Sequence, residues 1–224
     1  MLLTISGLLE QASLERIAAM LAGAPFVDGK LSAGMTAAKV KQNEEVAADA
    51  AHINALNALV MKPLVAHPTF KLGVLPQRVA VPYYARYRAG MAYGLHVDDP
   101  VMGPADGRYR SDVSVTVFLN EPNDYTGGEL MIQGHFGEQA IKLAAGDAVI
   151  YPSSSLHRVA EVTSGERLVA VTWIQSMIRD PAQRAILYDL GQLRETALQQ
   201  TPQSEDTQRL DRAYVNLVRM WAEV

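Results

Sequence analysis

Short apolar runs separated by turn-forming residues fill the chain between residues 78 and 177, and this pattern restricts the possible folds more than any other feature. Val113, Val115 and Val117 alternate with Asp112, Ser114 and Thr116, which is the two-residue period of a β-strand. Further apolar runs follow at 129–132, 148–151 and 168–174, separated by turn signals that include Gly127-Gly128, Gly146-Asp147 and Ser164-Gly165. Many short strands joined by turns predict a sandwich, jelly roll or barrel.

Residues with helical spacing lie on both sides of this stretch. Leu14, Ile17 and Leu21 predict an N-terminal helix that ends near Gly23, and a second helix is predicted from about Glu44, to be bent or ended by Pro63. After the strands, Asp180-Pro181 predicts the start of a third helix, because aspartate caps a helix N-terminus and proline fits its first turn. Tyr214, Leu217 and Trp221 mark a last amphipathic helix, which we expect to dock on the core or on another subunit.

We therefore predict an α+β protein with a β-rich core. The core is expected at residues 78–177, an N-terminal helical part packed on it at 1–77, and a helical extension at 178–224. A chain of 224 residues can bury a core of this size without covalent cross-links.

The composition excludes several kinds of chemistry. The chain has no cysteine, which rules out disulfides, iron–sulfur clusters and cysteine nucleophiles, and fits a reducing cytoplasm. Its formal charge is −4 and no basic run stands out, so nucleic acid is not expected as a partner. No window offers the roughly 20 uninterrupted apolar residues of a membrane helix, and the N-terminus lacks the basic residues of a secretory signal. We expect a cytoplasmic protein without a membrane partner.

A transition-metal site in this chain must be built from its five histidines and from carboxylates. His96 and Asp98 are two residues apart, so in a strand both side chains project from one face. His157 follows a later apolar run. Two imidazoles and one carboxylate on one face of a metal form the facial triad of non-haem Fe(II) oxygenases.

Arg167 lies ten residues after His157, beyond the Ser164-Gly165 turn signal. If the two residues sit on paired strands of a hairpin, the guanidinium points into the same cavity as the imidazole. Arginine binds a carboxylate through two parallel hydrogen bonds. A dicarboxylate held by Arg167 at one end would then reach the metal at the other.

These residues stand in an order that is typical of a known family. The pattern Tyr-x-x-Gly-x-x-Tyr-x-x-His-x-Asp from Tyr87 to Asp98, the distal His157, the arginine ten residues later and the pair Gly127-Gly128 resemble the prolyl-hydroxylase branch of the Fe(II)/2-oxoglutarate-dependent dioxygenases. The chain length and the helical ends resemble the bacterial PKHD-type hydroxylases in particular.

The resemblance implies a double-stranded β-helix, which is a distorted jelly roll, with helices packed around it. It implies that His96, Asp98 and His157 bind Fe(II), that Arg167 binds the C5 carboxylate of 2-oxoglutarate, and that Tyr87 touches this cosubstrate. It further implies hydroxylation of a small-molecule or peptide substrate with O₂, release of succinate and CO₂, and L-ascorbate as the reductant of the iron.

Two other functions remain open at this point. One is a cupin-type metal-binding enzyme, although cupins usually carry a His-x-His pair where this chain has His96 and Asp98. The other is a non-catalytic β-sandwich binding module. We assign no role to His52, His67 or His135, and Trp173 either lines the pocket or belongs to the core. Homo-oligomerisation and the identity of the substrate are open as well.

Overall fold

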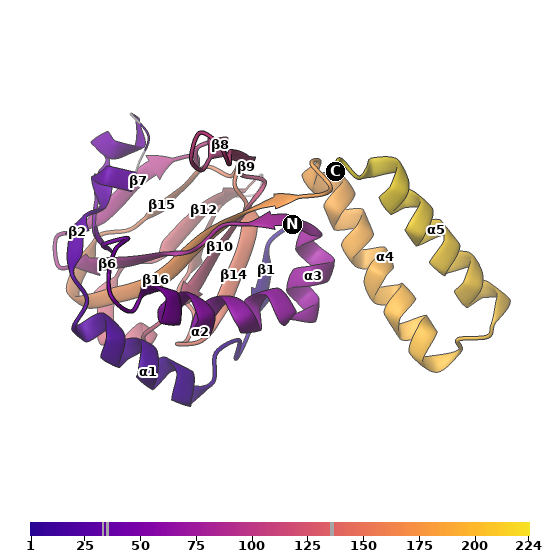
Figure 1. Ribbon diagram of the computed structural model, residues 1–224, viewed down its shortest axis with the longest axis horizontal. Helices are drawn as coiled ribbons and strands as arrows, with labels where there is room; N and C mark the ends of the chain where they lie inside the picture. The colour runs from indigo at the N-terminus through magenta and orange to yellow at the C-terminus, as the bar shows by residue number, and fades with distance from the viewer. Residues whose placement is uncertain (33, 35, 135–136) are drawn as a thin grey trace.

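Two antiparallel sheets face each other in the body of the molecule, and helices cover the outer face of the larger one (Figure 1). The structure is a computed structural model that describes the whole chain except residues 33, 35 and 135–136. This arrangement confirms the predicted double-stranded β-helix with a β-rich core.

The larger sheet has nine strands within the described residues, all paired antiparallel. Its central path runs in the order β1 (Leu3–Ile5), β14 (Ala148–Pro152), β10 (Val113–Phe118), β16 (Val162–Ser176), β6 (Tyr83–Arg88), β4 (Glu44–Val46) and β2 (Phe26–Asp28). Strands β11 (Tyr125–Gly127) and β5 (Pro76–Val79) pair with the two ends of β16. The long β16 is therefore the spine of this sheet.

The smaller sheet has five strands within the same described residues. They follow the order β13 (Gly137–Ile141), β12 (Leu130–Gly134), β15 (His157–Val159), β7 (Ala92–His96) and β3 (Lys41–Gln42). A separate two-stranded ribbon joins β8 (Val101–Met102) to β9 (Tyr109–Arg110). Strands from residues 1–77 thus enter both sheets, a contribution that the helical spacing in this segment did not reveal.

The predicted strand around Val113 is present as β10, and it is buried on both faces. Val113, Val115 and Val117 belong to the apolar cluster beneath the helices, whereas Phe118 belongs to a second cluster between the two sheets. Ser114 and Thr116 are also fully buried, because they face the space between the sheets. A central strand of this kind can carry polar residues only where they find partners or line a pocket.

Three helices cover the outer face of the larger sheet: α1 (Gln11–Ala22), α2 (Ile53–Ala66) and α3 (Pro68–Val74), with short 3₁₀ turns η1 (Gly29–Ser32), η2 (Ala37–Lys39) and η3 (Pro122–Asp124) elsewhere. The predicted helix start near Glu44 is wrong. Residues 44–46 form strand β4, and α2 begins at Ile53 after the exposed N-cap His52. Pairing of β4 with β6 and β2 overrides the helical spacing of this segment.

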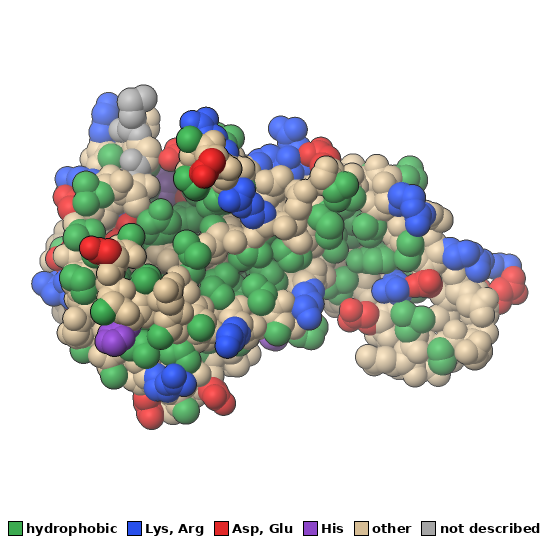
Figure 2. Space-filling model, viewed as in Figure 1, with side chains coloured by type: hydrophobic (Ala, Val, Ile, Leu, Met, Phe, Trp, Pro, Cys, Tyr) green, Lys and Arg blue, Asp and Glu red, His purple; other side chains and the backbone are tan. Residues whose placement is uncertain are grey.

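The C-terminal helices α4 (Pro181–Gln200) and α5 (Glu205–Trp221) pack against each other and extend beside the body (Figure 1). The predicted cap is present, because the Asp180 side chain accepts hydrogen bonds from the first backbone amides of α4. Leu187, Tyr214 and Trp221 share a small apolar cluster with Leu72 of α3, which is separate from the main core. The last helix therefore packs on α4, which in turn packs on α3, and not directly on the β core as expected. Figure 2 shows apolar side chains gathered where these helices meet the body.

The Ser164-Gly165 signal does not mark a turn. Both residues lie inside β16, and Gly165 allows β11 to approach closely, since a Cβ there would meet the Asp124 backbone. Across the described residues, none of the helices has both the length and the apolar character needed to cross a membrane.

Candidate metal centre and cosubstrate pocket

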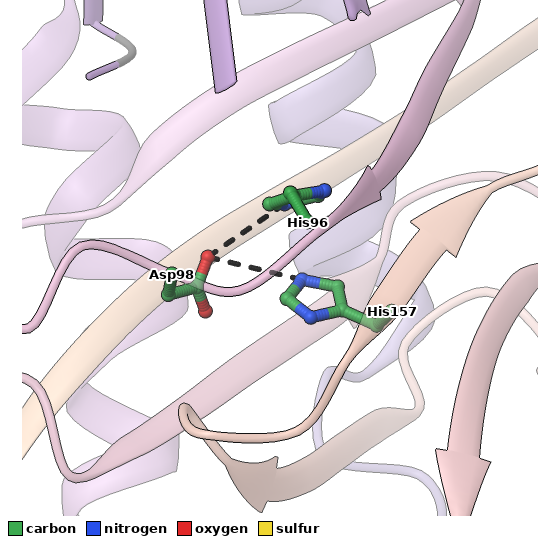
Figure 3. A group of neighbouring side chains, drawn as sticks. All are labelled: His96, Asp98 and His157. Carbon is green, nitrogen blue, oxygen red and sulfur yellow. Dashed lines mark ion pairs between the residues drawn. The ribbon is translucent and has the colours of Figure 1, made fainter. Parts of the chain in front are cut away.

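His96, Asp98 and His157 converge at one end of the space between the sheets (Figure 3). One ligand atom from each lies within 4.8 Å of the others. The Asp98 Oδ1 atom is 3.9 Å from His96 Nε2 and 3.8 Å from His157 Nε2. The structure thus brings together the three residues that the sequence singled out.

Strand pairing places the two imidazoles next to each other. His96 is the last residue of β7, His157 is the first of β15, and they are direct partners in the antiparallel register. Residues directly opposite on one face are close neighbours, and the two ring centres lie 4.3 Å apart. Asp98 lies beyond the end of β7, so the loop after the strand turns its carboxylate toward both rings.

Backbone carbonyls orient both imidazoles. His96 Nδ1 donates to the Gly94 carbonyl at 2.8 Å, and His157 Nδ1 donates to the Ser155 carbonyl at 2.9 Å. Each Nε2 atom then carries the lone pair and faces the Asp98 carboxylate. Burial and the neighbouring His157 lower the pKa of His96 to about 4, so its imidazole is neutral near pH 7.

A serine pair fixes the carboxylate. Ser114 Oγ donates to Asp98 Oδ2 at 2.5 Å and lies 2.7 Å from Ser153 Oγ. Asp98 Oδ1 is left toward the two imidazoles. Ser114 was not predicted as a partner of Asp98, although a serine among the valines of a buried strand is a signal of a polar contact.

Arg167 lies on the sheet opposite His157, which corrects the predicted hairpin. His157 is on β15 of the smaller sheet and Arg167 is on β16 of the larger one, so the two strands are not paired. The side chains face one pocket from its two walls. The two side chains share a cavity, as predicted. The cavity lies between two facing sheets and not within one hairpin.

The Arg167 guanidinium is buried without an anionic partner. The residue is 2% exposed, its Nε has no hydrogen-bond partner, and no carboxylate of the described residues lies within ion-pair distance of it. A buried cation is costly unless an anion compensates it. Gly128 leaves room for this side chain, since a Cβ there would lie 3.1 Å from Arg167 Cδ.

Aromatic side chains line the rest of the pocket. Tyr87 is the register partner of Arg167, and burial raises the pKa of its hydroxyl, so it stays protonated. Tyr83, Tyr93 and Trp173 also line the pocket, which answers the open question about Trp173. Tyr83 and Trp173 pack edge to face, with ring centres 5.7 Å apart.

Lys41, Asn43 and Glu45 are among the lining residues that were not anticipated. Their spacing of two is a strand signal, but the predicted helix from Glu44 obscured it. Of the histidines without an assigned role, His52 stands at the N-cap position of α2 without a side-chain capping hydrogen bond, and His67 caps α3 by accepting from the Thr69 amide. His135 lies outside the described residues.

The donor set fits a divalent transition metal with open positions, because two imidazoles and one carboxylate converge on one point. The unpaired Arg167 fits an organic anion on the opposite wall. Together, the fold and this pocket define the class of Fe(II)- and 2-oxoglutarate-dependent oxygenases. Residues 82–175 match the family model of the 2OG-Fe(II) oxygenase superfamily, and residues 181–223 match the PKHD-type hydroxylase C-terminal domain.

Relatives narrow this class. The chain is 56% identical, over all of both chains, to a PKHD-type hydroxylase of Thioalkalivibrio sulfidiphilus. It belongs to the PKHD-type hydroxylases, and the protein is an oxygenase that hydroxylates a substrate with O₂ and converts 2-oxoglutarate to succinate and CO₂. This membership decides against the cupin-type and non-catalytic alternatives.

Solved structures share the fold at low sequence identity. A prolyl-4-hydroxylase from Pseudomonas putida is 20% identical, with 78% of this chain and 92% of that chain covered and a TM-score of 0.54. HygX from Streptomyces hygroscopicus, with nickel, 2-oxoglutarate and hygromycin B bound, is 16% identical, with 79% and 84% covered and a TM-score of 0.55.

Proposed function

We propose that His96, Asp98 and His157 are the Fe(II) ligands of this oxygenase. The observation that carries the proposal is the convergence of their three ligand atoms within 4.8 Å. The carbonyls of Gly94 and Ser155 and the Ser114 hydroxyl support it, because ligand side chains held by neighbouring hydrogen bonds are preorganised for a metal.

We further propose that Arg167 binds the C5 carboxylate of 2-oxoglutarate and that Tyr87 contacts the same cosubstrate. Bound Fe(II) supplies the redox chemistry that couples O₂ and oxidative decarboxylation of 2-oxoglutarate to hydroxylation of a C–H bond. The chain supplies position: Arg167 neutralises the distal carboxylate, and Tyr87 offers a protonated hydroxyl beside it. Apolar neighbours such as Leu130 and Val159 exclude water from this end of the pocket.

The substrate is proposed to enter through a second hollow of about 500 Å³ beside the metal pocket. Both spaces are lined by Tyr83 and Trp173, and Asp99, next to Asp98, lines the outer one. The named structural neighbours include a prolyl hydroxylase and a protein with bound hygromycin B. Both a peptide and a small molecule are therefore retained as substrate classes.

Several coarser expectations belong to the same proposal. We infer a division into residues 1–77, the oxygenase core 78–177 and the extension 178–224. L-Ascorbate is proposed as the reductant that maintains Fe(II), on family resemblance. A cytoplasmic location, homo-oligomerisation, and the absence of nucleic-acid and membrane partners also stay proposals.

Succinate formation tests the proposal. Purified protein with Fe(II), 2-oxoglutarate and O₂ should release succinate, and the rate should rise when the true substrate is present in a metabolite or peptide mixture. Asp98→Ala should lose this turnover, whereas His52→Ala, a histidine exposed at the start of α2, should keep it. Unchanged succinate release by Asp98→Ala would contradict the ligand assignment.

A further inference from the structure

Residues 41–46 close one edge of the sandwich by crossing from one sheet to the other. At its start, Lys41 pairs with Tyr93 of β7 in the smaller sheet. At its end, Glu45 pairs with Ala85 of β6 in the larger sheet. The segment therefore forms the side wall of the pocket whose other walls are the two sheets.

Every second residue of this wall turns inward. Lys41, Asn43 and Glu45 are all buried and line the pocket. The two charged residues satisfy each other: Lys41 Nζ lies 2.5 Å from Glu45 Oε1 and also donates to Ser32 Oγ at 2.8 Å. The charges of this wall are thus neutralised within the protein.

Asn43, between them, is left without partners. It is 4% exposed, and neither its Oδ1 nor its Nδ2 makes a hydrogen bond within the described residues. Gly29 packs behind it: the Gly29 amide donates to the Asn43 carbonyl at 2.9 Å, and a Cβ at Gly29 would overlap Oδ1. With its oxygen against Gly29, the carboxamide turns its Nδ2 toward the pocket. A buried polar group without a partner is unfavourable, and one that lines a pocket points to a ligand.

Two neighbours place Asn43 at the cosubstrate end. Glu44 pairs with Arg86, so Asn43 lies beside Tyr87, the residue opposite Arg167. Burial raises the pKa of the Tyr87 hydroxyl, so the hydroxyl keeps its proton. Asn43 and Tyr87 line the same pocket, so their side chains are neighbours on its wall. Arg167 Nε, on the far side of this tyrosine, is another buried atom without a partner.

We propose that Asn43 is a positioning residue for 2-oxoglutarate, acting through Tyr87. When 2-oxoglutarate is bound, the Asn43 Nδ2, which has no partner among the described residues, would donate to the Tyr87 hydroxyl oxygen. The hydroxyl proton would then be free to be donated to the distal carboxylate beside Arg167. This inference rests on the proposed cosubstrate site and adds a residue to it. It gives the wall between the sheets a function in recognising the cosubstrate.

The test compares two ligands and two backgrounds. Affinity is measured anaerobically on the Fe(II) protein by titrating 2-oxoglutarate, or 2-oxopentanoate, which lacks the distal carboxylate, into the visible charge-transfer band. Asn43→Ala should weaken 2-oxoglutarate binding by about threefold to tenfold, and Asn43→Asp by more, because an aspartate would accept the hydrogen bond of the Tyr87 hydroxyl and repel the dianion. Neither variant should change 2-oxopentanoate affinity by more than about twofold.

Measurements in a Tyr87→Phe protein distinguish a positioning role of Asn43 from a structural one. In Tyr87→Phe protein, Asn43→Ala should have no further effect on 2-oxoglutarate affinity, because the residue through which it acts has gone. Asn43→Ser provides a second small variant should the alanine protein not fold, and Asn216→Ala, on the exposed side of α5, is the matched control.

The outcomes are distinguishable. Equal weakening of both ligands, or additive losses with Tyr87→Phe, would overturn the inference in favour of a structural role. Wild-type affinity in Asn43→Ala and Asn43→Asp would overturn it outright while leaving the proposed function intact. If Arg167→Ala also keeps wild-type affinity for 2-oxoglutarate, the proposed cosubstrate site itself is wrong.

Discussion

Arg167 and Tyr87 lie directly opposite each other on β16 and β6, with the guanidinium carbon 5.1 Å from the centre of the phenol ring. The pairing stacks a permanent cation on an aromatic face and sets a protonated hydroxyl beside it. Both side chains are almost fully buried. This arrangement of two buried donors that line one pocket supports the proposed binding of the cosubstrate carboxylate.

Arg167→Ala should weaken 2-oxoglutarate binding by about tenfold to several hundredfold, because charge-assisted hydrogen bonds are among the strong ones. Arg167→Lys should recover part of the affinity, since lysine offers a point charge without the planar fork. Iron content should stay at the wild-type level in both. Affinity is measured by anaerobic titration, and Arg158→Ala, whose partly exposed guanidinium pairs with Glu138, is the control. Loss of iron together with 2-oxoglutarate would instead indicate a structural role for Arg167.

His96→Ala and Asp98→Ala should each lose most of the bound metal, because two remaining ligands hold a labile ion poorly. The protein is reconstituted with Fe(II) without oxygen, desalted and analysed for metal by elemental analysis. One Fe(II) per chain is expected in the wild type and in His52→Ala. Copurified Zn²⁺ or Ni²⁺ is compatible with this assignment, since such metals bind the same donors tightly. Full iron occupancy in His96→Ala or Asp98→Ala would contradict the assignment.

Gly128→Ala should destabilise the fold and disturb the cosubstrate end together. Gly128 has a φ of +69°, which favours glycine, and a Cβ there would lie 2.9 Å from Val162 Cγ2 and 3.1 Å from Arg167 Cδ. We expect a loss of about 1–3 kcal/mol in the free energy of unfolding. Urea unfolding and 2-oxoglutarate titration measure the two effects. Gly23→Ala, at a site with no atom within 4 Å and no positive φ, should leave the affinity unchanged. A Gly128→Ala protein with wild-type values in both measurements would argue against this packing role.

The metal-free protein should lose stability as the pH falls from about 6.5 to about 4. The pKa of His96 is lowered to about 4 by burial and by His157, so the unfolded chain binds a proton that the folded chain does not until the pH is much lower. The contribution of neutral His96 to the free energy of unfolding is fully present above pH 6.5. It decreases by up to about 3 kcal/mol between pH 6.5 and pH 4. Urea unfolding at pH 4.5, 5.5, 6.5 and 7.5 measures it. In His96→Gln the slope should become smaller; an unchanged slope would mean that other groups cause it.

The sequence predicted the β-rich core and the residues of the metal centre because these depend on local patterns. Val113 to Val117 shows its strand period directly, and His96 and Asp98 are only two residues apart. The two-residue spacing suggested convergence within a strand, yet Asp98 lies past the end of β7 and reaches the site through a loop. The predicted convergence is nevertheless present, because the Asp98 carboxylate lies 3.9 Å from His96 Nε2.

Features that depend on pairing between distant segments were not predictable in this way. Val46 and Ile53 lie at spacings that resemble a helix, but β4 gains partners from β6 and β2, and the strand is favoured. The sequence around Gly165 predicts a turn, yet this glycine lies inside β16, where the absence of a Cβ lets β11 pack closely against it. For the same reason the local spacing of Lys41, Asn43 and Glu45 could indicate a strand but not a pocket wall, because the pocket forms only where the two sheets meet.

The most direct test of the central claim is the visible absorption spectrum of the anaerobic protein with one Fe(II) per chain, recorded before and after addition of 2-oxoglutarate. We predict a weak metal-to-ligand charge-transfer band that appears with 2-oxoglutarate, saturates at one equivalent per chain and does not form with succinate, which lacks the keto group needed for chelation. The band should be absent in Asp98→Ala and should require higher 2-oxoglutarate in Arg167→Ala. Iron bound at full occupancy with no such band at saturating 2-oxoglutarate would contradict the assignment of this pocket.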